Sequence, residues 1–419
     1  MPESDTPSEY MILLPAARVA VFSDDVNTIE VAQKLTQDWR FARVDITAQK
    51  GDVDAAIAHL AEHESPDLVI VQTETIDDAF AAKLEELAGN CDEGTAAVVI
   101  GPVNDVYLYR KLIDMGVSDY LVKPMNADIM GNVIAKALIE KRGVTGSKLI
   151  SFIGAKGGQG TSALAQAMAW GVSELGGHKT VLMDCAGGWS GLSVGMGFEP
   201  LTTLDEALKA AAKGDEDSIK RVMFRASDKL EVLAQGSDQL FGPAADPEQV
   251  EGLLEHFLAR TPVVIADLSQ SDPAVARLMI SRSNMVIVVA QPVLSSLRLA
   301  RSVIHEMKDI RGGTLDAVKL VLNMQGYAGA DEVPKADIKQ AMEFEPSATV
   351  PFAPKVFVKS ENDAAPLIKN SEGAAFVKTI LLPLVQTILA IDGDGAKASV
   401  SSRSSAGILG GILGSFSKK

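Results

Sequence analysis

A glycine-rich segment at residues 155–162, AKGGQGTS, carries the clearest chemistry in the chain. Gly157, Gly158 and Gly160 allow tight backbone turns, and such turns present N–H groups to phosphate oxygens. Ser162 closes the segment, at a position where a hydroxyl can ligate Mg²⁺. The segment therefore predicts a site for the phosphates of ATP or ADP together with Mg²⁺. The alternative is an ordinary glycine-rich turn between a strand and a helix.

The segment differs from the common phosphate-loop pattern G-x-x-x-x-G-K-[ST]. Ala155 replaces the first glycine, and Thr161 stands where the usual lysine would be. Lys156 instead precedes the glycines. Gln159 and Thr161 are still expected to bind the nucleotide, because the backbone amides around residues 157–162 would hold its phosphates. The usual lysine places its charge beside the β- and γ-phosphates. Its loss predicts weaker binding and, at most, slow ATP hydrolysis.

The apolar KLISFIG, the glycine loop and the helical ALAQAMAWGVSEL follow one another in the order that a phosphate loop requires. With its K-G-G-x-G sequence, this region resembles the MinD/ParA superfamily of ATPases, and the resemblance covers roughly residues 148–390. It implies a face-to-face homodimer in which Lys156 reaches across to the phosphates bound by the partner subunit.

The same resemblance implies roles for residues further along the chain. Asp184 begins the first switch, and Ala186 replaces an aspartate that orients water, which again disfavours hydrolysis. Asp267 takes the Walker-B position, where a carboxylate holds Mg²⁺ directly or through water, unless it only caps a turn. Asn323 fits the adenine contact, because an amide both donates and accepts; the alternative is a buried turn asparagine. Pro351 belongs to the late loop that closes over the base.

Residues 17–130 resemble a response-regulator receiver whose site is damaged. Asp24 and Asp25 follow the first strand and Lys123 follows the last one, as the Mg²⁺-binding acids and the receiver lysine do. The phospho-accepting aspartate, however, is replaced by Gln72. An amide cannot form an acyl phosphate, so we expect a pseudo-receiver that serves as a docking face. Whether the two aspartates bind metal or are ordinary loop acids stays open at this point.

A pseudo-receiver fused to a K-G-G-x-G ATPase resembles the CpaE/TadZ family, which helps to localise and assemble the Flp/Tad type IV pilus machinery at the bacterial inner membrane. The resemblance implies pilus and secretion-machinery proteins as partners. It also implies a cytoplasmic protein that is peripheral to the inner membrane, with a polar position as a further expectation.

These sites need parallel strands to position them, and short apolar runs do alternate with helical patterns. They predict an α/β protein of two doubly wound domains, an N-terminal receiver-like (flavodoxin-like) domain and a C-terminal MinD/ParA-like P-loop domain. The strand candidates are ARVAVFS, PDLVIVQT, AAVVIGP and DYLVKP, then KLISFIGA, HKTVLMD, KLEVLAQG, TPVVIADLS, NMVIVVAQP and AVKLVLNM. The expected parts are an extension (1–16), the receiver-like domain (17–141), a linker (142–147), the ATPase domain (148–391), a flexible linker (392–405) and an amphipathic tail (406–419).

Charge and cysteine content bound the function classes. The 419 residues carry a net charge of −16, and residues 1–142 hold 25 acidic and 12 basic residues. Nucleic-acid phosphates need clustered Lys and Arg, so no nucleic-acid partner is expected for the whole molecule. Cys91 and Cys185 fit no metal spacing, which favours a reduced cytoplasm. No apolar run reaches the roughly 18 residues of a transmembrane helix.

The C-terminal segment AGILGGILGSFSKK predicts a membrane-surface helix. Its apolar residues share one face of a helix, and two lysines end the chain. The apolar positions are Ile408, Leu409, Ile412, Leu413 and Phe416. Its glycines disfavour the helix in water, so we expect it to fold only on a surface. The alternative is a disordered or partner-docked tail.

Three functions are compatible with these sequence features. The leading one is an ATP-gated dimeric scaffold for pilus components, with weak or absent hydrolysis. A ParA-like DNA-binding partition ATPase is the alternative, and it requires a basic surface on the second domain. The third, a regulator controlled by phosphorylation, is disfavoured by Gln72.

Overall fold

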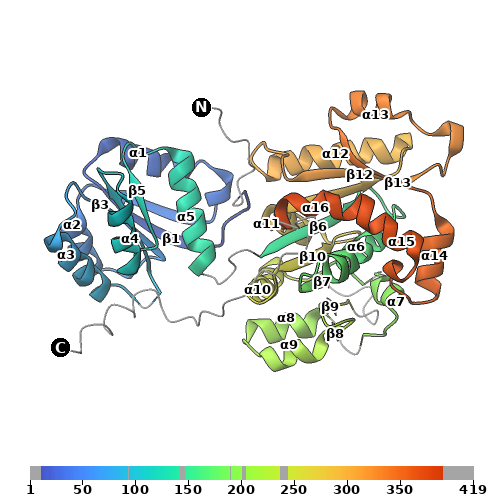
Figure 1. Ribbon diagram of the computed structural model, residues 1–419, viewed down its shortest axis with the longest axis horizontal. Helices are drawn as coiled ribbons and strands as arrows, with labels where there is room; N and C mark the ends of the chain where they lie inside the picture. Colours follow the sequence, from blue (N-terminus) through green and yellow to red (C-terminus); the bar gives the residue numbers. More distant parts are fainter. Residues whose placement is uncertain are drawn as a thin grey trace. The chain divides into compact units, whose positions relative to one another are not determined.

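The structure is a computed structural model, and it describes residues 11–92, 94–141, 147–188, 190–200, 204–235 and 244–389. These residues form two compact units: residues 13–141, and residues 147–389 together with 11–12. Each unit is built around a largely parallel sheet with helices between the strands (Figure 1), so the predicted fold class is confirmed. The predicted flexible linker and amphipathic tail, 392–405 and 406–419, lie outside the described residues.

The first unit has a five-stranded parallel sheet in the order β2-β1-β3-β4-β5. This is the flavodoxin-like order. Successive strands are added on one side of β1 and then, from β3 onward, on its other side, which leaves a crevice at the carboxyl ends of β1 and β3. The strands are β1 (Ala17–Phe22), β2 (Val44–Gln49), β3 (Leu68–Gln72), β4 (Ala96–Gly101) and β5 (Asp119–Val122). The helices are α1 (Val26–Leu35), α2 (Val53–Leu60), α3 (Asp78–Gly89), α4 (Val106–Asp114) and α5 (Ala127–Lys141).

Helix caps account for some of the acidity of this unit. Four helices begin directly after an aspartate whose carboxylate accepts a hydrogen bond from a backbone N–H of the first turn. The capping residues are Asp25, Asp52, Asp77 and Asp105. A negative charge is also stabilised there by the helix dipole.

Strand β2 was not predicted from the sequence. It lies at the edge of the sheet and pairs only with β1. In its sequence VDITAQ only Val44 is buried, and the residues after it alternate between exposed and half-buried, whereas every residue of β3 and β4 is buried. The apolar-run criterion therefore detects the central strands and passes over this edge strand.

The second unit has an eight-stranded sheet in the order β13-β12-β11-β6-β10-β7-β9-β8, parallel except for β8. Its strands are β6 (Lys148–Gly154), β7 (Thr180–Asp184), β8 (Phe224–Arg225), β9 (Leu230–Leu233), β10 (Val263–Asp267), β11 (Met285–Ala290), β12 (Val318–Gln325) and β13 (Pro346–Pro351). The six predicted strands are present, and the two missed ones, β8 and β13, close the two ends of the sheet. Two residues form β8, and prolines bound β13, which is typical of edge strands.

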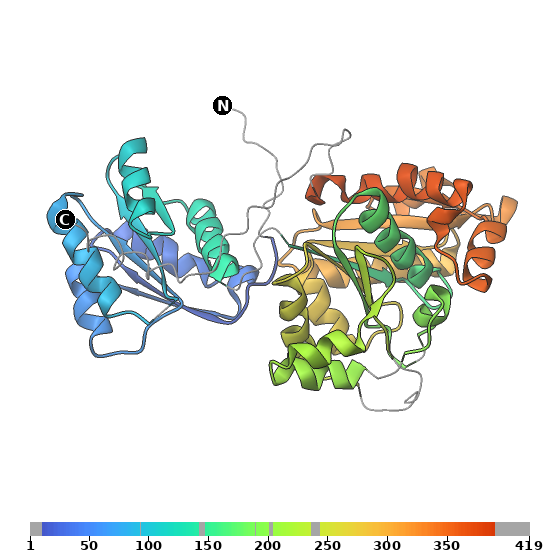
Figure 2. The same cartoon turned by 60° about the horizontal axis from the view of Figure 1, so that its bottom comes forward.

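Helices cover both faces of this sheet, with α6 and the C-terminal helices on one side and α10 and α11 on the other (Figures 1 and 2). The helices are α6 (Thr161–Trp170), α7 (Leu192–Met196), α8 (Leu204–Ala212), α9 (Glu216–Val222), α10 (Pro247–Leu258), α11 (Pro273–Arg282), α12 (Leu294–Ile310), α13 (Lys335–Met342), α14 (Pro354–Asn362), α15 (Ser371–Phe376) and α16 (Leu382–Leu389).

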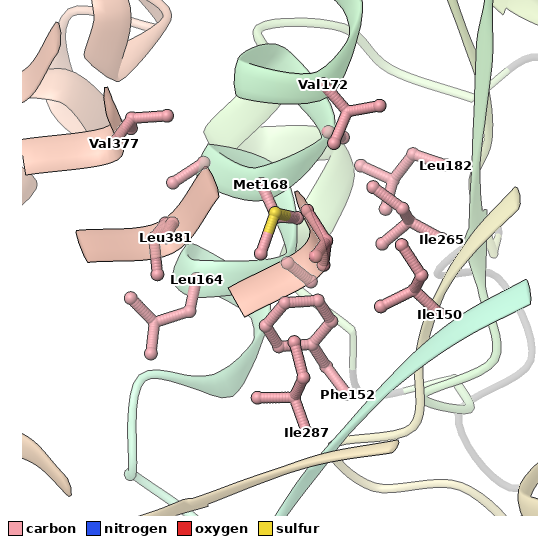
Figure 3. Packing of buried hydrophobic residues seen from close by; sticks show 14 of the residues in the cluster. Ile150, Phe152, Leu164, Met168, Val172, Leu182, Ile265, Ile287, Val377 and Leu381 are labelled. Carbon is pink, nitrogen blue, oxygen red and sulfur yellow. The ribbon is translucent and has the colours of Figure 1, made fainter. Parts of the chain in front are cut away.

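Helix α6 is the central core element of the second unit. Leu164 and Met168 face Phe152 of β6 on one side and Leu381 of the last helix on the other (Figure 3). The cluster is buried throughout, and close packing of this kind holds a helix firmly in place. Because α6 begins at the glycine loop, this packing also fixes the position of the loop.

The last helix continues from α15 through a π-helical turn, Val377–Leu381, into α16. Within the described part of the chain, Ser371–Leu389 is the one helix long and apolar enough to cross a membrane by length and composition, which the sequence reading did not single out. Its buried side chains, such as Leu381 and Val385, pack in the core with α6. A soluble core helix with such packing passes the same composition test.

Candidate functional site

The glycine loop connects β6 to α6 and has the backbone of an anion site. Gly158 and Gly160 have φ of 75° and 78°, in the left-handed region that favours glycine. Gly160 is the N-cap of α6 and has no side chain to cap the first turn, so the first N–H groups of the helix stay available to a ligand. A Cβ atom on Gly157 or Gly158 would meet no atom within 4 Å, so the outer side of the loop is open.

Two side chains of the loop point into the protein. Gln159 is 1% exposed, and its Oε1 accepts hydrogen bonds from the backbone N–H of Gln291 and the hydroxyl of Ser296. Thr161 is also buried, and its Oγ1 would lie 2.6 Å from a Cβ atom on Gly154. A threonine held under the strand end in this way cannot take over the role of the missing lysine.

Lys156 is the one basic residue of the loop, and its side chain is exposed. Among the described residues, the side chain of Lys156 has no hydrogen-bond partner and no salt-bridge partner. Its ammonium group is therefore available for a ligand or a second chain.

The oxygen atoms expected to hold Mg²⁺ come together behind the loop. The hydroxyl of Ser162 lies 3.1 Å from that of Ser269, and the backbone N–H of Ser269 donates to Oδ1 of Asp267 at 3.0 Å. The other carboxylate oxygen of Asp267, Oδ2, is buried and has no hydrogen-bond partner in the described structure. Carboxylate and hydroxyl oxygens are the ligands that Mg²⁺ prefers, so these residues fit the ion.

Asp184 and Asp267 stand side by side because their strands are in register. They end β7 and β10, and their Cα atoms are paired across this parallel ladder. Both side chains are fully buried. Asp184 accepts hydrogen bonds from the backbone N–H groups of Ala186 and Gln235. Two buried carboxylates so close together repel each other, and a divalent cation between them and a phosphate would relieve that repulsion.

Burial and the neighbouring Asp267 charge raise the pKa of Asp184 to about 7, although its backbone hydrogen bonds act in the opposite direction. Burial also raises the pKa of Asp267, against the effect of the Ser162 and Ser269 hydroxyls. Both carboxylates are thus destabilised as anions in the absence of a cation.

This predicts a pH-dependent effect of the Asp184→Asn substitution. A carboxyl whose pKa is higher in the folded than in the unfolded protein binds more protons when folded, so its contribution to stability falls as pH rises from about 4 to about 7. Without nucleotide or Mg²⁺, we expect the melting temperature of the variant minus that of the wild type to increase by at least about 3 °C between pH 5 and pH 8. Calorimetry in EDTA measures this difference. A difference that is constant or falls with pH would contradict the raised pKa.

A cavity of about 310 Å³ lies beside the loop. Its lining includes Gly160 and the polar side chains of Ser162 and Asn323, together with the apolar Pro351 and Phe352. The sequence predicts that Asn323 and Pro351 contact the nucleotide base, and both residues line this cavity. Further lining residues that it did not identify are Gln166, Trp170, Met324, Phe357 and Glu361. A flat aromatic base fits a small, mostly apolar cavity with a few polar groups at its rim.

The receiver remnants are arranged differently from what a phosphoryl-transfer site needs. Asp24 is exposed, and Asp25 accepts hydrogen bonds from the N–H and the hydroxyl of Thr28, so it is a helix cap. These hydrogen bonds with Thr28 lower the pKa of Asp25, although its partial burial acts against them. Lys123 forms a salt bridge with Glu74.

Gln72 lies at the end of β3 and is buried. Its amide accepts a hydrogen bond from Ser23 and donates one to Glu74 at 3.1 Å. The interactions of Gln72 and Lys123 therefore meet at Glu74, which the sequence reading did not identify. Gln72 and Lys123 thus both interact with other side chains of the same unit, Gln72 through hydrogen bonds and Lys123 through a salt bridge.

No protein-family model and no curated protein matches this chain. Among solved structures, it is similar to a ParA family ATPase from Chlorobium tepidum, at 18% identity over 58% of this chain and 98% of that one, with a TM-score of 0.48. It is also similar to the pilus assembly protein CpaE from Caulobacter crescentus, at 31% identity over 29% of this chain and 92% of that one, with a TM-score of 0.28. A CpaE2 pilus assembly protein from Sinorhizobium meliloti is 39% identical over 28% of this chain and 98% of that one, with a TM-score of 0.27.

The two sheets and the glycine loop define the class of protein: a receiver-like unit without its phospho-accepting aspartate, joined to a second α/β unit that carries a glycine loop between its strand β6 and its helix α6. Two solved CpaE proteins share 31% and 39% of their residues with this chain, which covers nearly all of each. The chain therefore belongs to the CpaE family of pilus assembly proteins.

Proposed function

We propose that this protein is an ATP-binding switch that acts as a dimeric scaffold in the assembly of the pilus machinery at the inner membrane. One observation carries the proposal. The open glycine loop, the cavity beside Asn323 and, next to Ser162, the Oδ2 of Asp267 that has no hydrogen-bond partner among the described residues together supply the parts that a Mg²⁺–nucleotide needs. The phosphates would lie on the loop, the ion between Ser162 and Asp267, and the base in the cavity.

Hydrolysis by this site would be slow or absent. Phosphoryl transfer needs positive charge near the transferred group and a side chain that orients the attacking water. Thr161 is buried and uncharged, and Ala186 is a buried methyl group next to Asp184. Neither can supply these functions, so bound ATP would persist and act as a signal.

Lys156 would complete the site of a second chain. It is exposed at the start of the loop, beside the open face formed by Gly157 and Gly158. An ammonium group placed there can reach phosphates bound by another copy, which would make dimerisation depend on ATP.

The C-terminal residues 406–419 would hold the dimer on the membrane. Their apolar positions and terminal lysines suit the surface of an anionic bilayer. One such segment binds weakly, but two on one dimer would bind much more tightly through effective concentration. ATP would then control membrane attachment.

Vesicle sedimentation tests this coupling. With anionic phosphatidylglycerol vesicles and Mg²⁺, we expect much more of the full-length protein in the pellet with ATP than with ADP. The Leu413→Glu substitution places a charge on the apolar face and should remove this difference while leaving nucleotide binding intact. Equal pelleting with the two nucleotides, or equal pelleting of wild type and variant, would contradict the coupling.

A further inference from the structure

Asn323 lies near the carboxyl end of β12, directly after the last residue paired with β11, and is only 5% exposed. Its Nδ2 donates a hydrogen bond to the backbone carbonyl of Gln159 at 2.7 Å, and its Oδ1 accepts one from the N–H of Met324 at 2.9 Å. A carbonyl can only accept and an N–H can only donate, so both bonds require the same orientation of the amide. The amide is therefore fixed toward the loop.

Gly160 lets this amide approach the loop so closely. A Cβ atom on Gly160 would lie 2.5 Å from Nδ2 of Asn323, closer than real Cβ atoms come to another atom. The same glycine has the left-handed φ of 78°. The bare backbone at this position is thus required both by the turn and by the contact with Asn323.

A second donor holds the neighbouring carbonyl. Nε2 of Gln291, just after β11, lies 3.3 Å from the carbonyl oxygen of Gly158 and 3.0 Å from the sulfur of Met324. The carbonyl groups of two consecutive loop residues therefore both face side-chain donors at the carboxyl ends of β11 and β12.

The direction of these carbonyls decides where the loop N–H groups point. In a trans peptide unit the C=O and the following N–H point in opposite directions. Holding the carbonyls of Gly158 and Gln159 inward turns the N–H groups of Gln159 and Gly160 outward, toward the open side of the loop. These are N–H groups that an anion on the loop would use.

We infer that Asn323, assisted by Gln291, is a positioning residue that aims the backbone N–H groups of the loop at phosphate, and that it does not read the base. The inference rests on the proposed nucleotide binding and deepens it. Recognition of the base then falls to the rest of the cavity, where Phe352 and Pro351 lie.

Inorganic tripolyphosphate, which has phosphates but no base, separates the two roles. Calorimetric titration with Mg²⁺ should show that Asn323→Ala weakens Mg–ATP and Mg–tripolyphosphate by the same factor, about tenfold, the usual effect of losing one buried hydrogen bond. Phe352→Ala is the matched control from the same cavity. It should weaken ATP and leave tripolyphosphate unchanged, because Phe352 makes no hydrogen bond to the loop among those of the described residues.

If Asn323→Ala weakens the binding of ATP but not that of tripolyphosphate, the inference is overturned and Asn323 is assigned to the base. Gln291→Ala gives an independent measurement if Asn323→Ala melts early, because Gln291 follows a different strand, β11, and keeps its backbone bond to Gln159. It should weaken both ligands severalfold, and unchanged tripolyphosphate binding would again overturn the inference. If the wild type binds neither ligand, the proposed function itself fails.

Discussion

Replacing Lys156 with alanine is expected to abolish dimerisation in the presence of Mg–ATP. The side chain is exposed at the start of the glycine loop and has no hydrogen bond or salt bridge within the described part of its own chain. A charge-assisted contact with a phosphate bound by the other subunit would therefore be lost completely, with nothing in the subunit itself disturbed. Sedimentation velocity should show wild-type protein changing from monomer to dimer on addition of Mg–ATP, and the variant staying monomeric.

Lys213→Ala is the matched control, since Lys213 is an exposed lysine elsewhere in the same unit. It should dimerise like the wild type. If Lys156→Ala dimerises fully with ATP, then the lysine acts within its own subunit or not at all, and the dimer must form through another surface.

The Gly160→Ala substitution should have the largest effect on nucleotide binding. An alanine would have to adopt φ near 78°, which costs about 1–2 kcal/mol for a residue with a Cβ atom. Its methyl group would also displace Nδ2 of Asn323, which lies 2.5 Å from the Cβ position. Loss of that buried hydrogen bond adds about 1 kcal/mol. We expect Mg–ATP affinity to fall by about a hundredfold.

Gly252→Ala shows whether a glycine-to-alanine change is harmful in itself. Gly252 lies within α10, and a Cβ atom there meets nothing within 4 Å. Alanine is also the better helix former, so this variant should bind ATP normally and be at least as stable as the wild type. If Gly160→Ala and the wild type bind ATP with equal affinity, phosphate binding does not depend on the conformation of the loop.

The sequence predicted the parts of the site that depend on local pattern. Glycines in a loop between an apolar strand and a helix are a local feature, and so is an aspartate that closes an apolar strand, such as Asp184 or Asp267. Edge strands such as β2 and β13 were not predicted, because β2 is polar and β13 is bounded by prolines. Their existence depends on pairing with a neighbour, which a single segment does not reveal.

The contacts that shape the site could not be predicted in this way. Ser269 meets Ser162 across 107 residues of sequence, and Asn323 meets Gln159 across 164. Such pairs follow from the order of the strands in the sheet and from their register. The amide of Asn323 illustrates the point: its residue type suits a base or a carbonyl equally well, and only the fold shows that it faces the loop.

In the receiver-like unit, too, residue types were predictive and long-range contacts were not. The loss of chemistry at Gln72 was predictable, because the residue type alone excludes an acyl phosphate. The use made of the remaining residues was not. Asp25 caps α1 through a local contact with Thr28, whereas Lys123 pairs with Glu74 across 49 residues of sequence, a contact that needs the folded unit.

Isothermal titration of purified wild-type protein with ATP and with ADP, in the presence and absence of Mg²⁺, shows whether the backbone around residues 157–162 holds the phosphates of a nucleotide. We expect saturable binding of one nucleotide per chain that is stronger with Mg²⁺. Absence of binding at millimolar nucleotide with Mg²⁺ would contradict it.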